Sequence, residues 1–227
     1  MKTFSHLFLY LLLAALGFSC SNFFEVESKA YLDIEKNRLD TPNDSVYSVF
    51  GLLSGMQDIG PVCVLLGELQ ADLMDLTPNA DADLKELNEH RASVDNPYLK
   101  ATGFYRIIND CNYMIQHVDT VTGDKALLQD YAAAVAIRAW TYLQMSKIYG
   151  PVPYFDHCIL DAEEALTADF PKMSPAELLP LLIAQVQDIL HIPRPFRRMN
   201  SIPVGKMIPG NEFLLGECYL WLNDYEN

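Results

Sequence analysis

The sequence predicts an all-α fold, and three observations carry that prediction. Apolar residues recur at three- and four-residue spacing in several stretches, which is the period of a helix face. Prolines and glycines are dispersed at the ends of these stretches and form no linker. Capping signals open two of them, at Thr41 to Asp44 and at Ser174, which Glu177 follows three residues later. The 227 residues suffice for one domain with a sizeable core, or for a piece of something larger.

The stretch Tyr131 to Phe155 is predicted to hold the central helix. Its alanines and large apolar residues cover nearly every face, which is typical of a helix buried on several sides. Gly150, followed by proline, ends the helix, and Lys147 in the last turn suits the carbonyl end of the helix dipole. Arg138 is the only charge in the middle, and an unpaired buried charge is strongly destabilising. We therefore expect a structural Arg138, paired with a carboxylate or with several carbonyls.

Four flanking stretches are predicted to be helical. The first follows the cap at Thr41, the second runs from Pro61 to Leu76, the third follows Ser174, and the fourth follows Pro209. The core-facing positions are Val46, Val49, Phe50, Leu53 and Met56 in the first; Leu65, Leu66, Leu69, Leu73 and Leu76 in the second; Leu178, Leu179, Leu182, Ile183, Val186 and Leu190 in the third.

A further helix, Phe104 to Val118, contains two asparagines. Asparagine is a poor residue for a helix interior, so we expect Asn109 and Asn112 to bridge backbone groups of neighbouring segments with their amides. The alternative is that they contact a ligand.

Three segments, in order along the chain, resemble the SusD/RagB family of Bacteroidetes outer-membrane lipoproteins. The matching residues are Arg138, Ala139, Trp140, Tyr142, Tyr149, Gly150 and Pro153 for the family's Arg-Ala-aromatic and Tyr-Gly-x-x-Pro signature; Tyr105, Ile108, Asn109, Asn112 and Ile115 for its asparagine helix; and residues 205–226 for a TPR-like helix, where Lys206 replaces an arginine and Gly216 an alanine. The resemblance implies a SusD-like helical fold with TPR-like helix pairs. It also implies a glycan- or nutrient-binding lipoprotein that delivers oligosaccharide to a SusC-like TonB-dependent transporter.

Residues 1–19 are predicted to be a signal peptide. Lys2 precedes an apolar run of 12 residues, Leu7 to Phe18, whereas a membrane-spanning helix needs about 20. Small residues then lead to Cys20, the expected lipidation site and mature N-terminus, although Gly17 stands where a lipobox usually has leucine. The alternative is an ordinary secreted protein. We expect a lipid-anchored protein of the cell outer membrane that faces the cell surface, although acidic residues begin only at Glu25 and do not directly follow Cys20.

Charge and motif content exclude several function classes. The formal net charge is −14, or −15 without Lys2, which argues against nucleic acid as a ligand. The chain contains no zinc-protease, serine-hydrolase, P-loop or dinucleotide-binding motif, and the cysteines lack metal-ligand spacing. Asn79, Asp81 and Asp83 have the start of a calcium loop, but its later ligands are missing. We expect no enzyme activity, no cofactor and no metal.

Asn96 and Tyr98 are the candidate ligand-binding residues. They lie in the loop that enters the Phe104 helix, and an aromatic ring with an amide on a loop above a rigid bundle suits sugar binding. Arg194, Arg197 and Arg198 form a small basic patch, for which we expect a solvated turn or internal salt bridges rather than docking.

The chain is expected to be a SusD-like N-terminal α-helical domain, residues 20–227, that is incomplete at its C-terminus. TPR-like units bury their apolar faces against neighbours, so we expect the last helix to leave an apolar surface uncovered. Its expected stripe is Leu214, Leu215, Tyr219, Leu220 and Trp221. The alternatives to glycan capture are a TPR-like scaffold that binds only protein and a surface hydrolase.

Overall fold

The computed structural model describes residues 39–69, 71 and 73–226. The predicted signal peptide and Cys20 lie outside the described residues. The side chain of Val46 does so as well.

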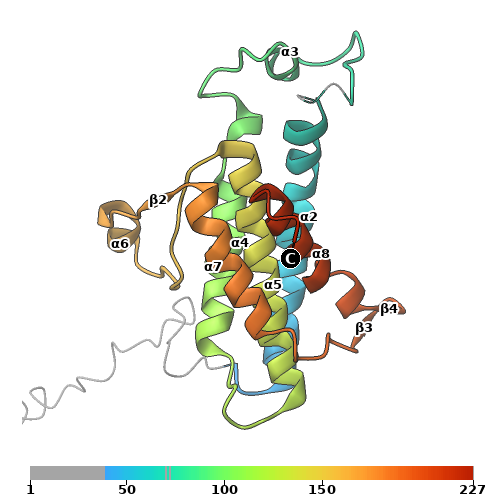
Figure 1. Ribbon diagram of the computed structural model, residues 1–227, viewed down its shortest axis with the longest axis vertical. Helices are drawn as coiled ribbons and strands as arrows, with labels where there is room; N and C mark the ends of the chain where they lie inside the picture. Colours follow the sequence, from blue (N-terminus) through green and yellow to red (C-terminus); the bar gives the residue numbers. More distant parts are fainter. Residues whose placement is uncertain (1–38, 70, 72, 227) are drawn as a thin grey trace, which may run out of the picture. The chain divides into compact units, whose positions relative to one another are not determined.

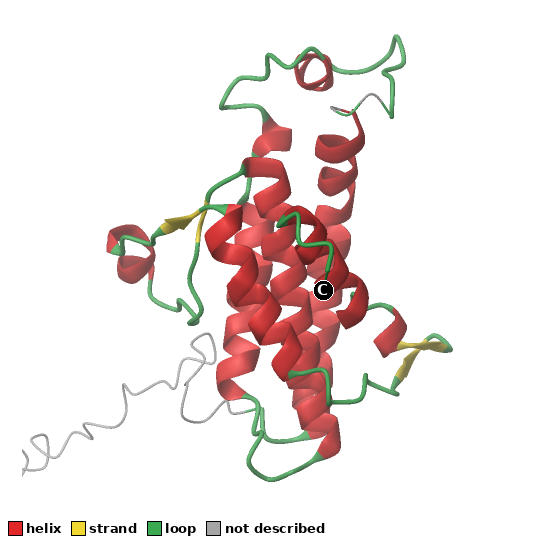
Figure 2. Ribbon diagram, viewed as in Figure 1, coloured by secondary structure: helices red, strands yellow, loops and turns green. Residues whose placement is uncertain are grey.

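The described part of the chain is all-α, as the sequence predicts (Figures 1 and 2). Its helices are α2 (Pro42–Val64), the π-helical η2 (Leu65–Leu69), α3 (Ala82–Asn88), η3 (Pro97–Leu99), α4 (Thr102–His117), α5 (Lys125–Tyr149), α6 (Ala162–Thr167), α7 (Pro175–Asp188), η4 (Val204–Lys206) and α8 (Asn211–Trp221). The strands form two short antiparallel pairs: β1 (Val152–Pro153) with β2 (Lys172–Met173), and β3 (Arg198–Met199) with β4 (Ile202–Pro203).

Helix α5 is the centre of the helix packing. It contacts α2, α4, α7 and α8, and α4 and α7 lie beside it in the views of Figures 1 and 2. Its alanines let these neighbours approach, while Ile137, Tyr142 and Leu143 are fully enclosed. The helix begins at Lys125, earlier than predicted, because Asp124 caps it by accepting a hydrogen bond of 2.7 Å from the Ala126 N–H.

One predicted boundary is wrong. We expected a separate helix from Pro61 to Leu76, but α2 continues through Pro61 into η2, and the described residues beyond Leu69 up to Leu76 are not helical. Pro61 has no backbone N–H, so the Gln57 carbonyl lacks the helical hydrogen bond that it would otherwise accept. Gln57 and Pro61 are both exposed, so water can replace that donor and the helix is not broken.

Helix α2 also has the length and composition of a membrane span. Ser48–Leu69 is the one such stretch among the described residues. The core helix of a folded domain has the same properties, and here Val49, Leu52 and Ile59 are buried in the core shared with α4 and α5. We therefore treat α2 as a core helix.

Candidate functional site

The signature residues hold the chain that leaves α5, which we call the strap (Pro153–Ile159). Asn112 is fully buried and donates from Nδ2 to the carbonyls of Phe155 at 3.3 Å and His157 at 2.9 Å. Its Oδ1 accepts a 2.6 Å hydrogen bond from Arg138 Nη1. Every polar atom of the Asn112 amide is thus used inside the protein, as expected for a polar clamp.

Arg138 is buried, and only 5% of it is exposed. Besides Asn112, its guanidinium donates to Gln185 Oε1 at 3.0 Å and to the Asp156 carbonyl at 3.5 Å. No carboxylate of the described residues forms an ion pair with it. Neutral amide and carbonyl oxygens accept from its two terminal nitrogens instead, whereas its buried Nε has no hydrogen-bond partner among the described residues. The expected several-acceptor environment is therefore present, and Arg138 links α4, α5, α7 and the strap.

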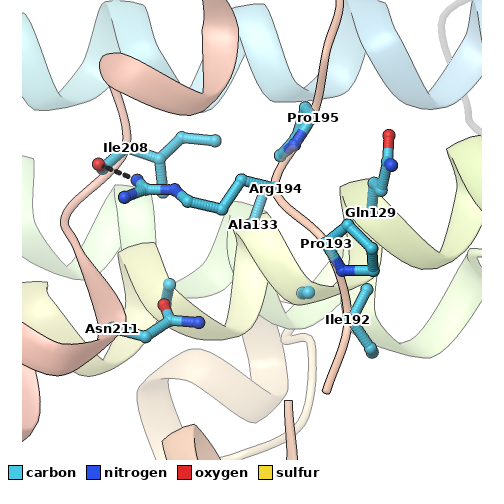
Figure 3. A pocket seen from close by; sticks show the side chains of 10 residues that line it. Gln129, Ala133, Ile192, Pro193, Arg194, Pro195, Ile208 and Asn211 are labelled. Atoms are coloured by element: carbon cyan, nitrogen blue, oxygen red, sulfur yellow. Dashed lines mark hydrogen bonds between the residues drawn. The ribbon is translucent and has the colours of Figure 1, made fainter. Parts of the chain in front are cut away.

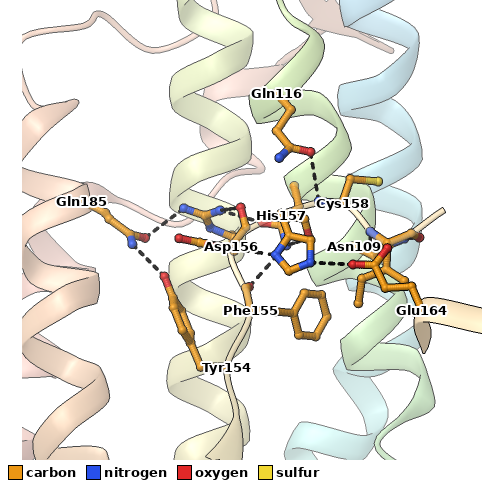
Figure 4. A network of polar contacts seen from close by, with 12 residues as sticks. Asn109, Gln116, Tyr154, Phe155, Asp156, His157, Cys158, Glu164 and Gln185 are labelled. Atoms are coloured by element: carbon orange, nitrogen blue, oxygen red, sulfur yellow. Dashed lines mark hydrogen bonds and ion pairs between the residues drawn. The ribbon is translucent and has the colours of Figure 1, made fainter. Parts of the chain in front are cut away.

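Figure 4 shows the rest of this network. Asn109 donates to the Ile159 carbonyl at 2.9 Å and accepts from its N–H at 2.7 Å, while Gln116 accepts from the Cys158 N–H at 2.9 Å. Because Asn109, Asn112 and Gln116 share one face of α4, this face pairs with the extended strap much as a neighbouring strand would. The signature thus builds a scaffold.

Trp140 is one of the large apolar residues of the predicted central helix, and it packs against the main core but is only half-buried. The fully buried aromatic of this helix is Tyr142, whose hydroxyl donates to the Phe155 carbonyl at 2.9 Å and accepts from the Phe155 N–H at 3.0 Å. Burial raises the pKa of Tyr142 above its ordinary value, so the hydroxyl keeps its proton. Helix α5 therefore has one less enclosed face than its composition suggests.

The other signature residues form the exit from α5. Tyr149 packs edge-on against Phe104, with ring centroids 6.0 Å apart, and Gly150 ends the helix with φ of +73°, which favours glycine. The Pro153 carbonyl accepts a 3.4 Å hydrogen bond from the Tyr105 hydroxyl. The turn thereby directs the chain into the strap.

The loop that carries the candidate ligand residues is held by its own contacts. Asn96 is buried; its Nδ2 donates to the Asp83 carbonyl at 2.9 Å, and its Oδ1 accepts from the Tyr98 N–H at 3.1 Å. The Tyr98 hydroxyl donates to Asp81 Oδ2 at 3.0 Å, and Asp81 also caps α3. These contacts give Asn96 and Asp81 structural tasks. Ligand binding by Asn96 and Tyr98 stays a prediction.

An open pocket of about 550 Å³ lies where η2 meets α5 and α8, and we call it the Trp221 pocket. Trp221, at the end of α8, is 47% exposed. Lys147 Nζ lies 5.9 Å from its ring centroid and forms a 2.6 Å ion pair with Glu217. The lining is Cys63, Val64, Leu66, Gly67, Glu68, Ala71, Leu73, Gln144, Lys147, Ile148 and Trp221. The pocket thus combines an aromatic ring with amide, carboxylate and ammonium groups.

The wall of this pocket contains the π-helix η2, a feature frequently found at functional sites. It supplies Leu66, Gly67 and the carboxylate of Glu68. Burial raises the pKa of Cys63 to about 11, so this lining residue is a thiol at neutral pH and a poor nucleophile. Among the described residues, no group of three His, Cys, Asp or Glu is placed to hold a metal ion.

Sequence reasoning missed the Trp221 pocket. Its walls come from three parts of the chain, residues 63–73, residues 144–148 and Trp221, and about 70 residues separate each part from the next. Neither the π-helix nor the exposure of Trp221 has a local sequence signal. The nearest signal was the expected apolar stripe of the last helix. In that stripe Leu214 is buried, Leu215 and Tyr219 are half-buried, and only Leu220 and Trp221 are exposed.

A second cleft, between α5 and residues 192–211, is nearly filled (Figure 3). Its free volume is about 10 Å³, roughly the space of one water molecule. Arg194 lies in it and donates to the Ile208 carbonyl. This cleft has no room for a sugar.

The architecture defines a helical protein with antiparallel, TPR-like helix pairs around α5. A solved SusD superfamily protein from Bacteroides thetaiotaomicron matches it with a TM-score of 0.63 and 18% sequence identity, over 83% of this chain. The match covers 46% of that protein, so the chain spans less than half its length. No protein-family model and no curated protein matches the chain. The likeness shows the fold, and the predicted SusD-like all-α fold is confirmed.

Proposed function

We propose that this protein captures an oligosaccharide in the Trp221 pocket as part of nutrient uptake. The observation that carries the proposal is a half-exposed tryptophan ring in an open pocket, with Gln144 and Glu68 in its lining. The pocket volume of about 550 Å³ falls within the range typical of small-ligand sites. The SusD-like fold supports the same class of function.

The groups present suit a sugar. The apolar face of the indole ring accepts the C–H face of a pyranose, while the Gln144 amide and the Glu68 carboxylate can hydrogen-bond to hydroxyl groups. Lys147 lines the same pocket, and its ion pair with Glu217 and its contact with the indole ring fix the orientation of Trp221. The proposed activity is binding without turnover.

The proposal includes the anchor and the partner. Cleavage after residue 19 and lipidation of Cys20 would tether residues 20–227 to the outer membrane, where a SusC-like TonB-dependent transporter would receive the oligosaccharide. Mass spectrometry of the mature N-terminus tests the anchor. A mature protein that begins at another residue would contradict it.

Trp221→Ala tests the pocket. Wild-type protein should bind at least one member of a panel of neutral oligosaccharides in calorimetry and leave it intact. Trp221→Ala should weaken that binding about tenfold or more, since burial of a large apolar side chain contributes about 1.5–3 kcal/mol. The matched control is Phe213→Ala on the same helix, because Phe213 is exposed but does not line the pocket. Equal losses in both variants would contradict the site, and cleavage of the oligosaccharide would favour the hydrolase alternative.

A TPR-like scaffold that binds only protein remains the second candidate, because α8 carries exposed apolar side chains. Phe213 is 87% exposed and Leu220 is 59% exposed. The two residues are seven positions apart and so lie on one face of α8, and apolar surface of this kind marks protein-interaction sites where it is contiguous. Loss of partner binding in Phe213→Ala, without any oligosaccharide binding by the wild type, would favour the scaffold.

A further inference from the structure

One segment of the chain is positively charged, although the protein as a whole is negatively charged. Residues 189–211 contain Arg194, Arg197, Arg198 and Lys206 and not a single Asp or Glu, whereas the whole chain has a formal net charge of −14. The segment connects α7 to α8 and includes the β3–β4 hairpin. Its four cations divide into two that build the segment and two that face outward.

Arg194 and Arg197 build the segment. Arg194 donates to the carbonyls of Ile208 and Pro209, the latter at 3.1 Å, and so closes the loop on itself. Arg197 forms an ion pair with the fully buried Asp130 of α5 and donates to the Pro42 carbonyl at 3.4 Å. These contacts fix the hairpin against α5 and the start of α2. They also agree with the internal salt bridges expected from the sequence.

Arg198 and Lys206 are exposed, and neither forms an ion pair with any carboxylate of the described residues. Arg198 donates to the Ser201 carbonyl, at 3.1 Å, across the hairpin turn. Asn200 and Ser201 have φ of 48° and 68°, the left-handed pair of a tight two-residue hairpin turn. Arg198 is thus presented on a short, defined turn rather than on a long loop.

These two cations line an open pocket of about 500 Å³, which we call the Phe196 pocket; Arg194 also lines it, with its guanidinium bound to the Ile208 and Pro209 carbonyls. Phe196, which is 76% exposed, forms a wall together with Pro195, Pro203 and Gly205. A side chain at Gly205 would place its Cβ 2.9 Å from the Pro195 carbonyl oxygen, so glycine permits the close approach that shapes the pocket. An exposed ring thus stands beside two cations that have no acidic partner among residues 39–69, 71 and 73–226.

We propose that the Phe196 pocket binds an acidic sugar, a uronic acid unit within an oligosaccharide. The ring face of Phe196 contacts the C–H face of the sugar, and Arg198 and Lys206 bind the carboxylate. Charges beyond about 8 Å are screened at physiological ionic strength, so these local cations outweigh the negative charge elsewhere on the protein. The inference rests on the proposed function in that the ligand is a saccharide, and it adds the chemical class of one unit and a second point of contact.

The experiment compares trigalacturonate with its fully methyl-esterified form, which keeps the sugar rings but removes the charge. In calorimetry on the full chain, the wild type should bind trigalacturonate about tenfold more tightly than the ester, because hydrogen bonds from a cation to a carboxylate are stronger than those to a neutral ester oxygen. Arg198→Gln/Lys206→Gln should remove that preference, and raised NaCl should weaken it in the wild type. Phe196→Ala should weaken the binding of both trigalacturonate and its ester.

Two controls separate this site from general charge and from the Trp221 pocket. Lys100→Gln/Lys125→Gln removes the same charge at exposed positions elsewhere and should leave the preference unchanged. Trp221→Ala should weaken binding of both ligands by a similar factor, because Trp221 contacts the sugar and not the carboxylate. Thermal unfolding should be unaltered in the variants at Arg198, Lys206, Phe196, Lys100 and Lys125, because these side chains are exposed.

Each contrary result has a distinct meaning. A preference that survives in Arg198→Gln/Lys206→Gln overturns the inference. Binding of neutral oligosaccharides that Trp221→Ala weakens, without any binding of trigalacturonate, overturns the inference alone. Absence of all saccharide binding overturns the proposed function as well. Binding to phosphatidylglycerol vesicles that the double variant loses, without binding of trigalacturonate, would replace the acidic sugar by a membrane surface.

Discussion

Helices α5 and α8 have similar apolar content but different surroundings. Helix α5 is packed by neighbours along most of its length, and its one central charge, Arg138, is satisfied by amide and carbonyl oxygens. Helix α8 buries Leu214 and Cys218 against the core but leaves Phe213, Leu220 and Trp221 exposed. Apolar periodicity therefore predicts that a helix has a face to bury, but not that the described chain covers it.

The comparison also separates two kinds of residue. On α5 and its neighbour α4, polar side chains form hydrogen bonds with the backbone of the strap, so they stabilise the structure. On α8 the exposed aromatics are free to contact something else, so they are the better candidates for binding. Stability measurements should respond to the first group, and binding measurements to the second.

The largest effect is expected for Asn112→Leu. This change removes an acceptor of Arg138 and leaves the His157 carbonyl without its Asn112 donor, in a fully buried site. We expect the free energy of unfolding to fall by about 3–4 kcal/mol, measured by urea denaturation. Asn79→Leu, at an exposed position, should change it by less than about 0.5 kcal/mol.

A double-mutant cycle sharpens this prediction. If the cost comes from an unsatisfied guanidinium, Asn112→Leu/Arg138→Met should be more stable than the sum of the two single effects predicts. Additive effects would show that the two side chains act independently, and the comparison of α5 with α8 would lose its physical basis.

The next effect is expected for Trp140→Ala. A fully buried large side chain replaced by alanine costs about 3–5 kcal/mol, and Tyr142→Ala should fall in that range. Trp140 is half-buried, so we expect about 1–3 kcal/mol for it, by the same urea titration. A loss at Trp140 equal to that at Tyr142 would show that the edge of α5 is enclosed after all.

The sequence predicted the fold well because helical signals are local. The caps at Thr41 and Ser174 lie where they were expected, and the Ser174 N–H donates to Glu177 Oε2 at 2.9 Å, as a capping box requires. The helix break at Pro61 was wrong, because a proline on an exposed helix face removes a donor without clashing with packed neighbours. Local sequence rules cannot tell a proline that ends a helix from a proline that a continuous helix tolerates.

The candidate site was predicted less well, since it depends on distant segments. Lys147 was placed by its helix end, yet its pairing with Glu217 and the ring of Trp221 brings together α5 and α8. Asn96 was selected for its chemistry alone, and burial shows that its amide holds the loop. A residue type in a suitable loop therefore says little until the contacts of its polar atoms are known.

The smallest effect on stability, and the one that tests the α8 side of the comparison, is expected for Phe213→Ser/Leu220→Ser. Both side chains are mostly exposed, so the free energy of unfolding should change by less than about 1 kcal/mol for the pair. If they form a continuous apolar surface, the wild type should bind a hydrophobic dye or self-associate, and the double variant should do so much less. Val94→Ser/Val121→Ser is the matched control, because these valines are 95% and 92% exposed but lie on separate loops.

A wild-type protein that stays monomeric and binds no dye would show that the exposed face of α8 is too small to act as an interaction surface. A large loss of stability in the double variant would instead mean that this face is covered in solution, by contacts that make α8 resemble α5.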